Sequence, residues 1–335
     1  MRTYLLPETG TFYKANLHCH TTLSDGGMTP EAVKESYKAQ GYSIVAFTDH
    51  QVLFPQNHLT DETFLALNGV EHGVTDDLNN KPVKCCHFSC IALDPDNKQT
   101  PCPDEGQFHR LRAKPEDLAH YCPQPGTVNF PRAYTSDAMN ALMAKIKEYG
   151  FFLTLNHVNY SLEQEDFICR YRYIDAMEIC NYGCIVLGFN DYNPQAYDAL
   201  LRSGHRISCI ATDDNHKLEH CFGGWTMIKA DKLEYRSITK ALENGHFYAS
   251  QGPAIDALWI EDNTVHIQCS PVRSIQFTTV GRHRQLTRAP AGEAITEASF
   301  VLDPKDRYFR VTVEDHNGKP ANTNAYFLDT LGIFK

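Results

Sequence analysis

The sequence lacks the long apolar runs that membrane insertion or export requires. No segment approaches the roughly 20 apolar residues of a membrane-spanning helix, and Met1–Pro7 does not have the apolar stretch of a secretion signal. Positive charge is also in deficit, because 31 Lys and Arg residues face 41 Asp and Glu residues, for a net charge of −10. A protein that grips nucleic acid needs many Lys and Arg contacts to phosphates. We therefore expect a cytoplasmic protein that acts on a small molecule, without a membrane contact or a stable nucleic-acid complex.

The twelve cysteines contain no paired C-x-x-C motifs, so a thiolate-bound structural zinc is not expected. Many of them, such as Cys180, Cys184 and Cys209, lie in apolar segments, where a thiol behaves as a small buried hydrophobic group. This distribution favours free thiols in a reducing compartment.

Histidines and a carboxylate occur together near the start of the sequence. His18 and His20 flank Cys19 in a predicted strand at 15–19, and alternation along a strand places both histidines on one side. Asp25 follows in Ser24-Asp25-Gly26. Imidazole together with carboxylate oxygens suits hydrolytic divalent cations. On its own, however, the histidine pair does not distinguish a metal site from an ordinary surface.

Predicted strands and helices alternate through the first two thirds of the chain. One helix begins at Pro30 with Thr29 as its N-cap and ends at Gly41, and another is capped by Ser136 and ends at Gly150. Strand-length apolar runs occupy 42–47, 67–71, 83–88, 151–155, 174–179 and 206–211. Polar residues gather at the ends of these runs, which is typical of an α/β barrel with its site at that end.

The order of these polar residues resembles that of the polymerase and histidinol phosphatase (PHP) superfamily of metal-dependent phosphoesterases. The resemblance covers about two hundred residues. The matching elements are H-x-H (His18 and His20), S-D-G (Asp25), T-D-H (His50), G-V-E (Glu71), the histidine of the next strand (His87), L-x-H (His157) and D-x-H (Asp214 and His216).

The resemblance implies a centre of up to three divalent cations, which could be zinc, manganese or iron. One cation would be held by His18, His20, Glu71 and Asp214, a second by Glu71, His87 and His157, and a third by Asp25, His50 and His216. Glu71, Asp214 and His216 would be catalytic, and a metal-bridging hydroxide would attack a phosphate monoester or diester of a small molecule or nucleotide.

Several assignments near these positions rest on less. Val158 follows His157 where many PHP proteins have proline, which puts this ligand in doubt, although His157 remains the choice. Asp213 and Asp214 compete for one position, and the D-x-H spacing selects Asp214. Asp49, Asp213 and Glu178 are expected to support the ligands through hydrogen bonds. His72 should point away from the metals because it follows Glu71 in a strand.

The regular pattern breaks between about 94 and 134, where a Pro-rich insertion is expected to shape access to the site. An arginine of this insertion, Arg110 or Arg132, could bind a substrate anion, and so could Arg170 or Arg172 after His157. For each of them a solvated surface role is the alternative.

The last eighty residues alternate apolar and polar positions between turns such as Asn317-Gly318. We therefore predict an α/β protein with two domains: a distorted (β/α)7 PHP-type barrel at 1–252, followed by a small antiparallel β-sandwich at 253–335. In the segments around 245–253 and 315–324, the sequence also resembles the C-terminal domain of PHP-type proteins related to the carbaryl hydrolases. The sandwich contains no cluster of candidate ligands and is expected to serve packing or an interface.

The second resemblance supplies a rival function, hydrolysis of a carbamate or carboxylic ester on the same metal site. A neutral aryl carbamate would need an apolar pocket, for which the candidates are Phe54, Phe108, Tyr134, Tyr160 and Tyr171. A third possibility is a metal-stabilised binding module without turnover. It fits less well, because a purely structural site closes its coordination with four ligands. The oligomeric state is left open.

Overall fold

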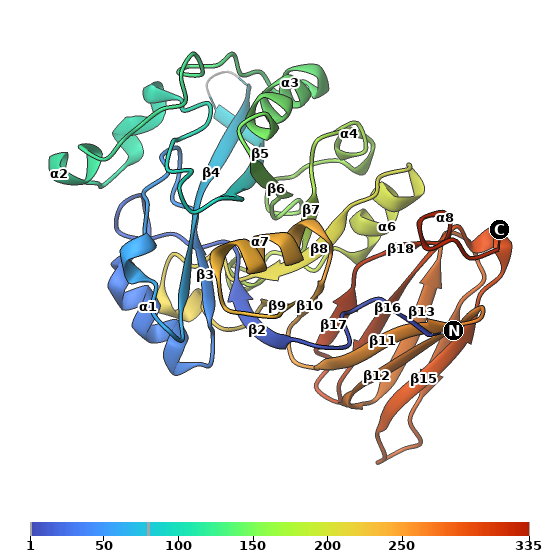
Figure 1. Cartoon of the computed structure of the whole chain (residues 1–335). Coiled ribbons are helices and arrows are strands. Elements are labelled where there is room, and N and C mark those ends of the chain that lie inside the picture. The colour runs from blue at the N-terminus through green and yellow to red at the C-terminus, as the bar shows by residue number, and fades with distance from the viewer. Residues whose placement is uncertain (1, 79–80, 335) are drawn as a thin grey trace.

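The computed structural model describes residues 2–78 and 81–334, and their side chains except those of residues 77, 78, 81 and 82. It is a mixed α/β structure with one large mixed sheet, a second sheet of four strands and few long helices (Figure 1). Within these residues, no helix combines the length and the apolar character that crossing a membrane requires.

The elements have the following bounds. The strands are β1 (Arg2–Tyr4), β2 (Thr11–Asn16), β3 (Ile44–Phe47), β4 (Leu65–Leu78), β5 (Lys81–Ala92), β6 (Phe151–Leu155), β7 (Ala176–Asn181), β8 (Ser208–Thr212), β9 (Trp225–Ala230), β10 (Phe247–Ser250), β11 (Ile255–Glu261), β12 (Thr264–Val272), β13 (Ser274–Thr279), β14 (Gln285–Arg288), β15 (Ile295–Val301), β16 (Tyr308–Glu314), β17 (Pro320–Thr323) and β18 (Tyr326–Phe327). The α-helices are α1 (Pro30–Ala39), α2 (Pro115–Leu118), α3 (Ser136–Lys147), α4 (Glu165–Ile168), α5 (Tyr182–Val186), α6 (Pro194–Arg202), α7 (Tyr235–Glu243) and α8 (Leu328–Leu331). The 3-10 helices are η1 (Asn57–Leu59), η2 (Glu105–Arg110), η3 (Leu218–His220) and η4 (Pro304–Asp306).

The large sheet runs in the order β14-β13-β16-β17-β10-β9-β2-β3-β4-β5-β6-β7-β8, and β18 pairs with β16. Its two distant strands β2 and β8 meet again just beyond their last residues. There, the backbone N–H of Asp214 donates to the carbonyl of His18 at 3.0 Å, and that of His20 donates to the carbonyl of Asn215 at 3.3 Å. The segment β2–β8 therefore curves back on itself.

The strands of this segment are not all parallel. β2, β3 and β4 pair in parallel, and so do β6, β7 and β8, but β5 is antiparallel to both β4 and β6. A regular β-α-β alternation was expected here. Only two residues of the sequence separate β4 from β5, too few for a helical crossover, and strands joined by so short a connection pair in the antiparallel sense.

Two predicted helix starts fared differently. Thr29 caps α1 as predicted, because its hydroxyl accepts the N–H of Ala32 at 3.2 Å. The prediction that Ser136 caps the next helix was wrong. Thr135 accepts the N–H of Ala138 at 3.3 Å, and Ser136 is the first residue of α3.

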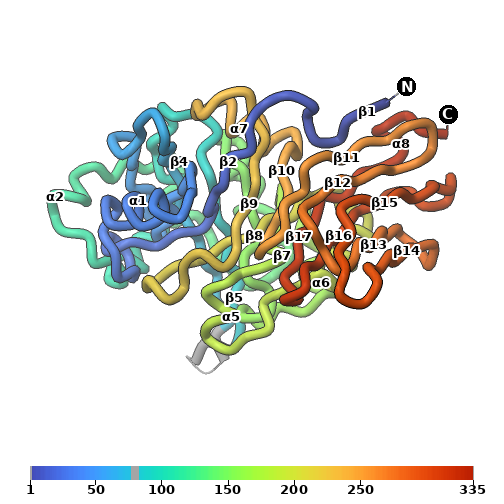
Figure 2. Tube along the Cα trace, turned by 90° about the horizontal axis from the view of Figure 1, so that it is seen from below, coloured from blue at the N-terminus to red at the C-terminus, as the bar shows by residue number. Residues whose placement is uncertain are grey.

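The C-terminal strands form two antiparallel layers around a common core. One layer is β1-β11-β12-β15 and the other is the β14-β13-β16-β17 part of the large sheet. The N-terminal β1 pairs with β11, so the two ends of the chain lie close together in Figure 2. The predicted division at residue 252 did not include β1 in the C-terminal part.

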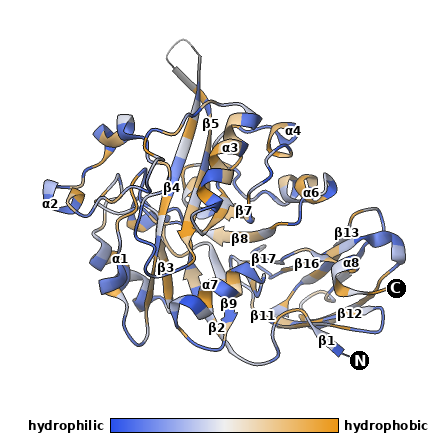
Figure 3. Ribbon diagram, turned by 45° about the horizontal axis from the view of Figure 1, so that its top comes forward, coloured by the Kyte–Doolittle hydropathy of each residue, from blue (hydrophilic) through white to orange (hydrophobic). Residues whose placement is uncertain are grey.

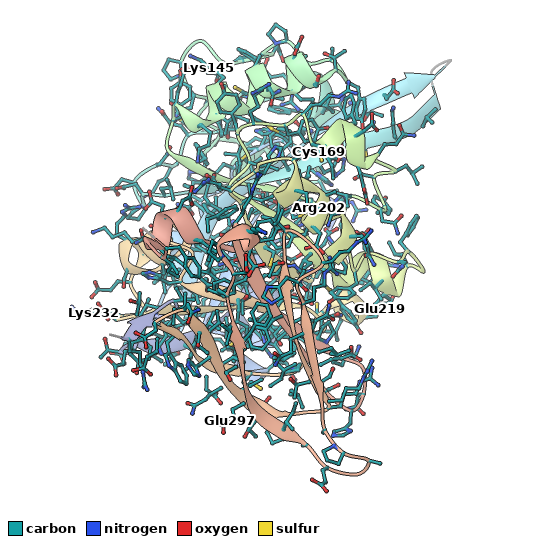
Figure 4. The ribbon with its side chains drawn as sticks, turned by 90° about the vertical axis from the view of Figure 1, so that its right-hand side faces the viewer. Lys145, Cys169, Arg202, Glu219, Lys232 and Glu297 are labelled. Atoms are coloured by element: carbon teal, nitrogen blue, oxygen red, sulfur yellow. The ribbon has the colours of Figure 1, made fainter. Side chains whose placement is uncertain are left out.

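Several contacts tie the C-terminal layers to the rest of the large sheet. β17 pairs with β10, and the Asn324 side chain accepts the N–H of Cys209 at 2.9 Å while donating to the carbonyls of Gly245 and Phe247 at 3.0 Å. Arg310 of β16 forms a buried ion pair with Asp198 of α6 at 2.7 Å. In Figure 4, α6, labelled at Arg202, lies between α3, labelled at Lys145, and β15, labelled at Glu297.

Hydrophobic residues concentrate on the strands, as Figure 3 shows for β3, β7 and β8, while the outer helices carry hydrophilic faces. On α3, Met139, Leu142, Met143 and Ile146 are buried in the core at the i, i+3, i+4, i+7 spacing of one helix face. The core thus fixes the strands whose ends carry the polar residues of the site.

Candidate metal centre

Histidine and carboxylate side chains that lie on β4 and β5 or in the segments following β2, β3, β6 and β8 meet at one end of the curved segment. The structure brings together all nine residues that the motifs select, in groups whose ligand atoms lie within 4.8 Å of one another. The groups are His20, Asp25, His50 and His216; His18, His20 and Asp214; and Glu71, His87 and His157.

The two N-terminal histidines are not within a strand, contrary to the prediction of a strand at 15–19. β2 ends at Asn16, and His18 and His20 lie beyond it. An isolated bridge between Cys19 and Asn215 keeps the backbone extended there, so the predicted alternation still holds. As a result, the Nε2 atoms of the two histidines lie 3.0 Å apart.

Glu71 occupies the middle of the cluster, with its carboxylate 1% exposed. Each of its two oxygens faces a different set of imidazole nitrogens. Oε1 lies 3.2 Å from His18 Nε2, 3.3 Å from His87 Nδ1 and 3.4 Å from His157 Nε2. Oε2 lies 3.3 Å from His20 Nε2 and 3.1 Å from His50 Nδ1. This carboxylate is therefore placed to be shared between neighbouring groups.

Asp214 faces the same histidines from the other side. Its Oδ1 lies 3.3 Å from His18 Nε2 and 3.2 Å from His20 Nε2, and its backbone φ is +48°, which a non-glycine residue rarely adopts. Asp214 Oδ1 and His20 Nδ1 are both buried without a hydrogen-bond partner. Strain and unpaired buried polar atoms at one place indicate a functional site.

The group that contains Asp25, His50 and His216 is the most open to solvent. The Asp25 carboxylate, 39% exposed, lies 3.5 Å from His50 Nε2 and 3.4 Å from His216 Nε2. His50 and His216 are exposed by 24% and 30%. Ligands from solvent would therefore reach this group more readily than the buried pair of His18 and His20.

Divalent cations fit these residues. Imidazole and carboxylate ligands bind zinc at about 2.0 to 2.2 Å, which places neighbouring ligand atoms about 3.0 to 3.4 Å apart. The separations around Glu71 and Asp214 fall in or close to this range. The unpaired Asp214 Oδ1 and His20 Nδ1 point to the same conclusion.

The charges of the cluster shift its pKa values in opposite directions. Burial alone would lower the pKa of His20, but the nearby carboxylates of Asp214 and Glu71 raise it to about 10. For the same kind of reason the pKa values of His18 and His87 rise well above their usual range. Burial opposes ionisation of Glu71, yet the neighbouring histidines hold its pKa well below the ordinary value. In the metal-free protein, protons on the histidines therefore compensate the negative charge of the carboxylates, as bound cations would do in the metal-loaded protein.

Glu178 supports two of the histidines from behind, in line with its predicted role. Its Oε1 accepts His18 Nδ1–H and the Thr212 hydroxyl, both at 2.7 Å. Its Oε2 accepts the backbone N–H of His157 and the Asn181 amide, both at 2.8 Å. A carboxylate at Nδ1 leaves the Nε2 lone pair of His18 directed at the cluster.

Asp49 holds the loop that carries Asp25. Its Oδ1 accepts Thr21 N–H at 2.8 Å and the Ser24 hydroxyl at 2.6 Å, and its Oδ2 accepts the Thr21 hydroxyl at 2.8 Å. These bonds leave Asp49 to support the loop, as predicted from the sequence.

Asp213 similarly braces the segment after β8. It accepts the Tyr37 hydroxyl at 2.9 Å and the N–H groups of Phe222, Gly223 and Gly224 at 2.8 to 3.0 Å. Burial raises its pKa to about 6.

Sequence reasoning missed Asn156 as a participant. Its side-chain amide donates to Glu71 Oε1 at 2.7 Å and to the Ser89 hydroxyl at 3.0 Å. An asparagine beside a histidine has no signature of its own. The antiparallel pairing of β5 with β6 and the position of Glu71 on β4 had to be known before this contact could be expected.

A cavity of about 640 Å³ opens beside the cluster. Its lining includes Asp25, His50 and His87 on the metal side. Of the arginines predicted to bind substrate, Arg110 and Arg132 line this cavity. The structure does not bring Arg170 and Arg172 to it.

Arg170 and Arg172 lie away from this cavity because they follow α4 on the outside of the structure. They line a separate hollow, and Arg170 pairs with Asp166 at 3.2 Å on the surface.

Arg132 is held by protein oxygens and by a histidine. Its guanidinium donates to the carbonyls of Gly73 at 2.9 Å and Cys102 at 2.6 Å, and to His72 Nδ1 at 3.3 Å. His72 donates in turn to the Pro101 carbonyl at 2.7 Å and points away from the cluster, as predicted. Arg132 therefore fastens the insertion to β4.

The apolar pocket considered for an aryl carbamate is not assembled. Of its five candidates only Tyr160 lines the cavity. Phe54 is 5% exposed within the core, and the Tyr134 and Tyr171 hydroxyls both donate to Glu163.

No protein-family model matches the chain, and no curated protein matches it by sequence. Among solved structures, it is similar to a two-domain protein from Bacteroides vulgatus containing a predicted PHP-like metal-dependent phosphoesterase. The identity is 14% and the TM-score 0.47, and the match covers 96% of this chain and 98% of the other.

Two further similar structures carry other descriptions. A lesion-specific endonuclease from Pyrococcus furiosus matches at 15% identity and a TM-score of 0.40, over 70% of this chain and 56% of the other. An amidohydrolase from Chromobacterium violaceum, with bound sulfate and no metal, matches at 16% identity and a TM-score of 0.39, over 70% and 96%. Similarities at these identities and TM-scores carry no argument about activity, so the function has to be argued from the site.

Proposed function

We propose that this protein is a metal-dependent hydrolase that cleaves phosphate monoesters or diesters of a small molecule. The observation that carries the proposal is the position of Glu71, whose two oxygens face imidazole nitrogens of different groups at 3.1 to 3.4 Å. A carboxylate so placed can be shared between cations held a few ångströms apart, as phosphoryl transfer on paired metals requires.

Up to three divalent cations, zinc, manganese or iron, would be held by the three groups of ligands. When bound, they would lower the pKa of a water molecule and neutralise charge on the phosphoryl oxygens. Through the two oxygens of each carboxylate, Glu71 and Asp214 would hold neighbouring groups of ligands in position relative to one another. His216 and Asp25 lie at the open side, where a substrate would enter.

The reaction is a hydrolysis. The oxygen of a water molecule forms the new bond to phosphorus, and the bond between phosphorus and the leaving-group oxygen breaks. The leaving group gains a proton and departs as an alcohol, and the water loses its proton to the site or to solvent. No further reactant is needed.

A binding module without turnover is less well supported. A structural metal site is closed by its protein ligands, whereas Asp25, His50 and His87 all line an open cavity. Hydrolysis of a carbamate or carboxylic ester also finds less support, because Tyr160 alone of the predicted aromatic residues lines that cavity.

We further propose that β2–β8 form the distorted seven-stranded barrel expected from the sequence, with a C-terminal β-sandwich packed beside it. The backbone bonds between Asp214 and His18 and between His20 and Asn215 support closure of the barrel. The net charge of −10 supports a small-molecule substrate over a stable complex with nucleic acid.

A panel of phosphate monoesters, phosphate diesters, carboxylic esters and carbamates, assayed with added manganese, zinc or iron, tests the function. We expect turnover of a phosphate ester that is lost with a chelator and restored by metal. Turnover of a carbamate or carboxylic ester without any phosphate ester would overturn the proposal.

A further inference from the structure

The insertion forms one wall of the cavity beside the metal centre. This insertion wall consists of the lining residues Asp104, Gln107, Arg110, Leu111, Arg132 and Ala133. It faces a cavity of about 640 Å³, which is in the size range of sites for whole metabolites and exceeds what a phosphate group alone fills. Most of a bound substrate would therefore contact something other than the metal ligands.

Backbone and side-chain hydrogen bonds hold the insertion in this place. The N–H groups of Arg112 and Ala113 donate to the carbonyl of Leu23, two residues before Asp25. The Thr100 hydroxyl accepts the N–H of Leu53, three residues after His50. With the clamp of Arg132 on β4, the insertion wall is fixed relative to the ligands on three sides.

Two amide side chains on this cavity have no partner within the described part of the chain. Gln107 lies on the insertion wall, and Gln51 lies next to His50. The Oε1 of each is enclosed by the protein without a hydrogen bond and is closed to a ligand, and the NH2 group of each donates to no other described residue. An unpaired NH2 group beside a cavity can donate to an acceptor on a ligand, which adds to the free energy of binding.

Gln51 is also held in an unusual backbone conformation. Its φ is +61°, and its N–H donates to the carbonyl of Glu71 at 2.9 Å, which fixes it against the ligand strand. Strained positions of non-glycine residues concentrate at functional sites. Gln51 thus combines an unpaired amide, a strained backbone and a place in the cavity.

The charged groups around the insertion wall are mostly committed to other partners. Arg132 is held by the carbonyls of Gly73 and Cys102, and Lys84 pairs with Asp76 at 3.5 Å. The carboxylate of Asp104 adds negative charge to the same wall. Of Arg110, Arg132 and Lys84, only Arg110 has no partner within the described part of the chain, so a second anionic group on the substrate would find one free cation there, opposed by Asp104.

We infer that Gln51 and Gln107 recognise the leaving group, and that the substrate is a phosphate ester of a polar, uncharged alcohol such as a polyol, a sugar or a nucleoside. The inference rests on the proposed phosphoesterase function. Each NH2 group offers donors, which the hydroxyl oxygens and ring acceptors of such an alcohol match. An aryl or alkyl leaving group would leave both amides unpaired.

The test compares kcat/KM of the metal-loaded wild type with that of Gln51→Leu and Gln107→Leu. The substrates are glycerol phosphate, a sugar phosphate and a nucleoside monophosphate, with phenyl phosphate as the apolar reference. Leucine keeps the approximate size and removes the amide. Gln99→Leu is the matched control, because Gln99 belongs to the same insertion but lies outside the cavity.

We expect each cavity variant to lose about 10-fold in kcat/KM on the best polar substrate, mainly through KM, which is the size of one lost hydrogen bond. The kcat/KM of the cavity variants on phenyl phosphate should change by less than about twofold, and so should that of Gln99→Leu on every substrate. An unchanged ratio of polar to phenyl substrate in both variants overturns the inference. So does a wild type that prefers phenyl phosphate or a bisphosphate to every polar monophosphate.

Failure of the proposed function gives a different result. In that case the wild type hydrolyses no phosphate ester at all with any added metal. The same polar and phenyl leaving groups, presented as carboxylic esters or carbamates, then test the two glutamines separately from the phosphoryl chemistry.

Discussion

Replacing Glu178 with Gln should weaken metal binding although Glu178 is not in any of the ligand groups. The carboxylate accepts four hydrogen bonds at 2.7 to 2.8 Å, from His18, Thr212, His157 and Asn181. Glutamine keeps the shape but presents an NH2 group where one oxygen accepted two donors. Two bonds are therefore lost, either those of His18 and Thr212 or those of the His157 N–H and Asn181, so one of the two ligand histidines loses the acceptor that positions it.

The size of the effect follows from these contacts. Two hydrogen bonds to a charged acceptor are worth about 1.5 to 3 kcal/mol each, and part of this is recovered by the amide. We expect the free energy of unfolding of the metal-free variant to be about 3 kcal/mol lower than that of the wild type. Loss of the partner behind a ligating histidine typically costs about 10- to 100-fold in metal affinity.

Two measurements separate these effects. Chemical denaturation of the metal-free protein reports folding, and competition with a chelator reports metal affinity. Thr212→Val serves as the control, because it removes one donor to Glu178 and leaves the carboxylate at His18. Its metal affinity should change by no more than about threefold. A folded Glu178→Gln protein with wild-type metal affinity would refute the reasoning.

Three other predictions concern the cluster and its surroundings. His50→Ala and Asp214→Ala should each abolish ester hydrolysis and lower the bound metal measured by elemental analysis, and normal turnover in either would contradict the ligand assignment. Because the carboxylates raise the pKa of His20 to about 10, metal binding at pH 7 should release protons, detectable by calorimetry in buffers of different ionisation enthalpy, and affinity should fall as the pH is lowered. Burial raises the pKa of Glu163 to about 7 from 4.5, so the native state keeps a proton that the unfolded state loses, and stability falls by about 3 kcal/mol as the pH rises from 4.5 to 7. Glu163→Gln should lack this fall in denaturation experiments, and parallel curves for the two proteins would argue against it.

The sequence was most informative where chemistry and position coincide. Ligands such as His50 and His157 end apolar runs, and residues that follow neighbouring strands must meet at the same edge of a sheet. The spacing to His216 was enough to choose Asp214 over Asp213, and the structure gives Asp213 four hydrogen bonds away from the cluster.

Contacts that depend on tertiary placement were not predictable in this way. The clamp of Arg132 on Gly73 joins residues 59 positions apart, and nothing in a Pro-rich insertion shows which carbonyls an arginine will find. The same holds for β1, whose three residues Arg2–Tyr4 carry too little pattern to indicate a partner strand as distant as β11. The helix start at Thr135 was misplaced by one residue because Thr135 and Ser136 are both good caps.

The contacts of Asn324 have a practical consequence for anyone who wishes to study the part of the chain with the candidate metal centre alone. This side chain holds Cys209 of β8 and the carbonyls of Gly245 and Phe247 in one set of bonds. A fragment ending at residue 252 would leave β10 as a bare edge strand and would free β8 just before Asp214. Exposed edges of this kind invite aggregation. The part of the chain with the candidate metal centre is therefore best expressed with the C-terminal strands attached.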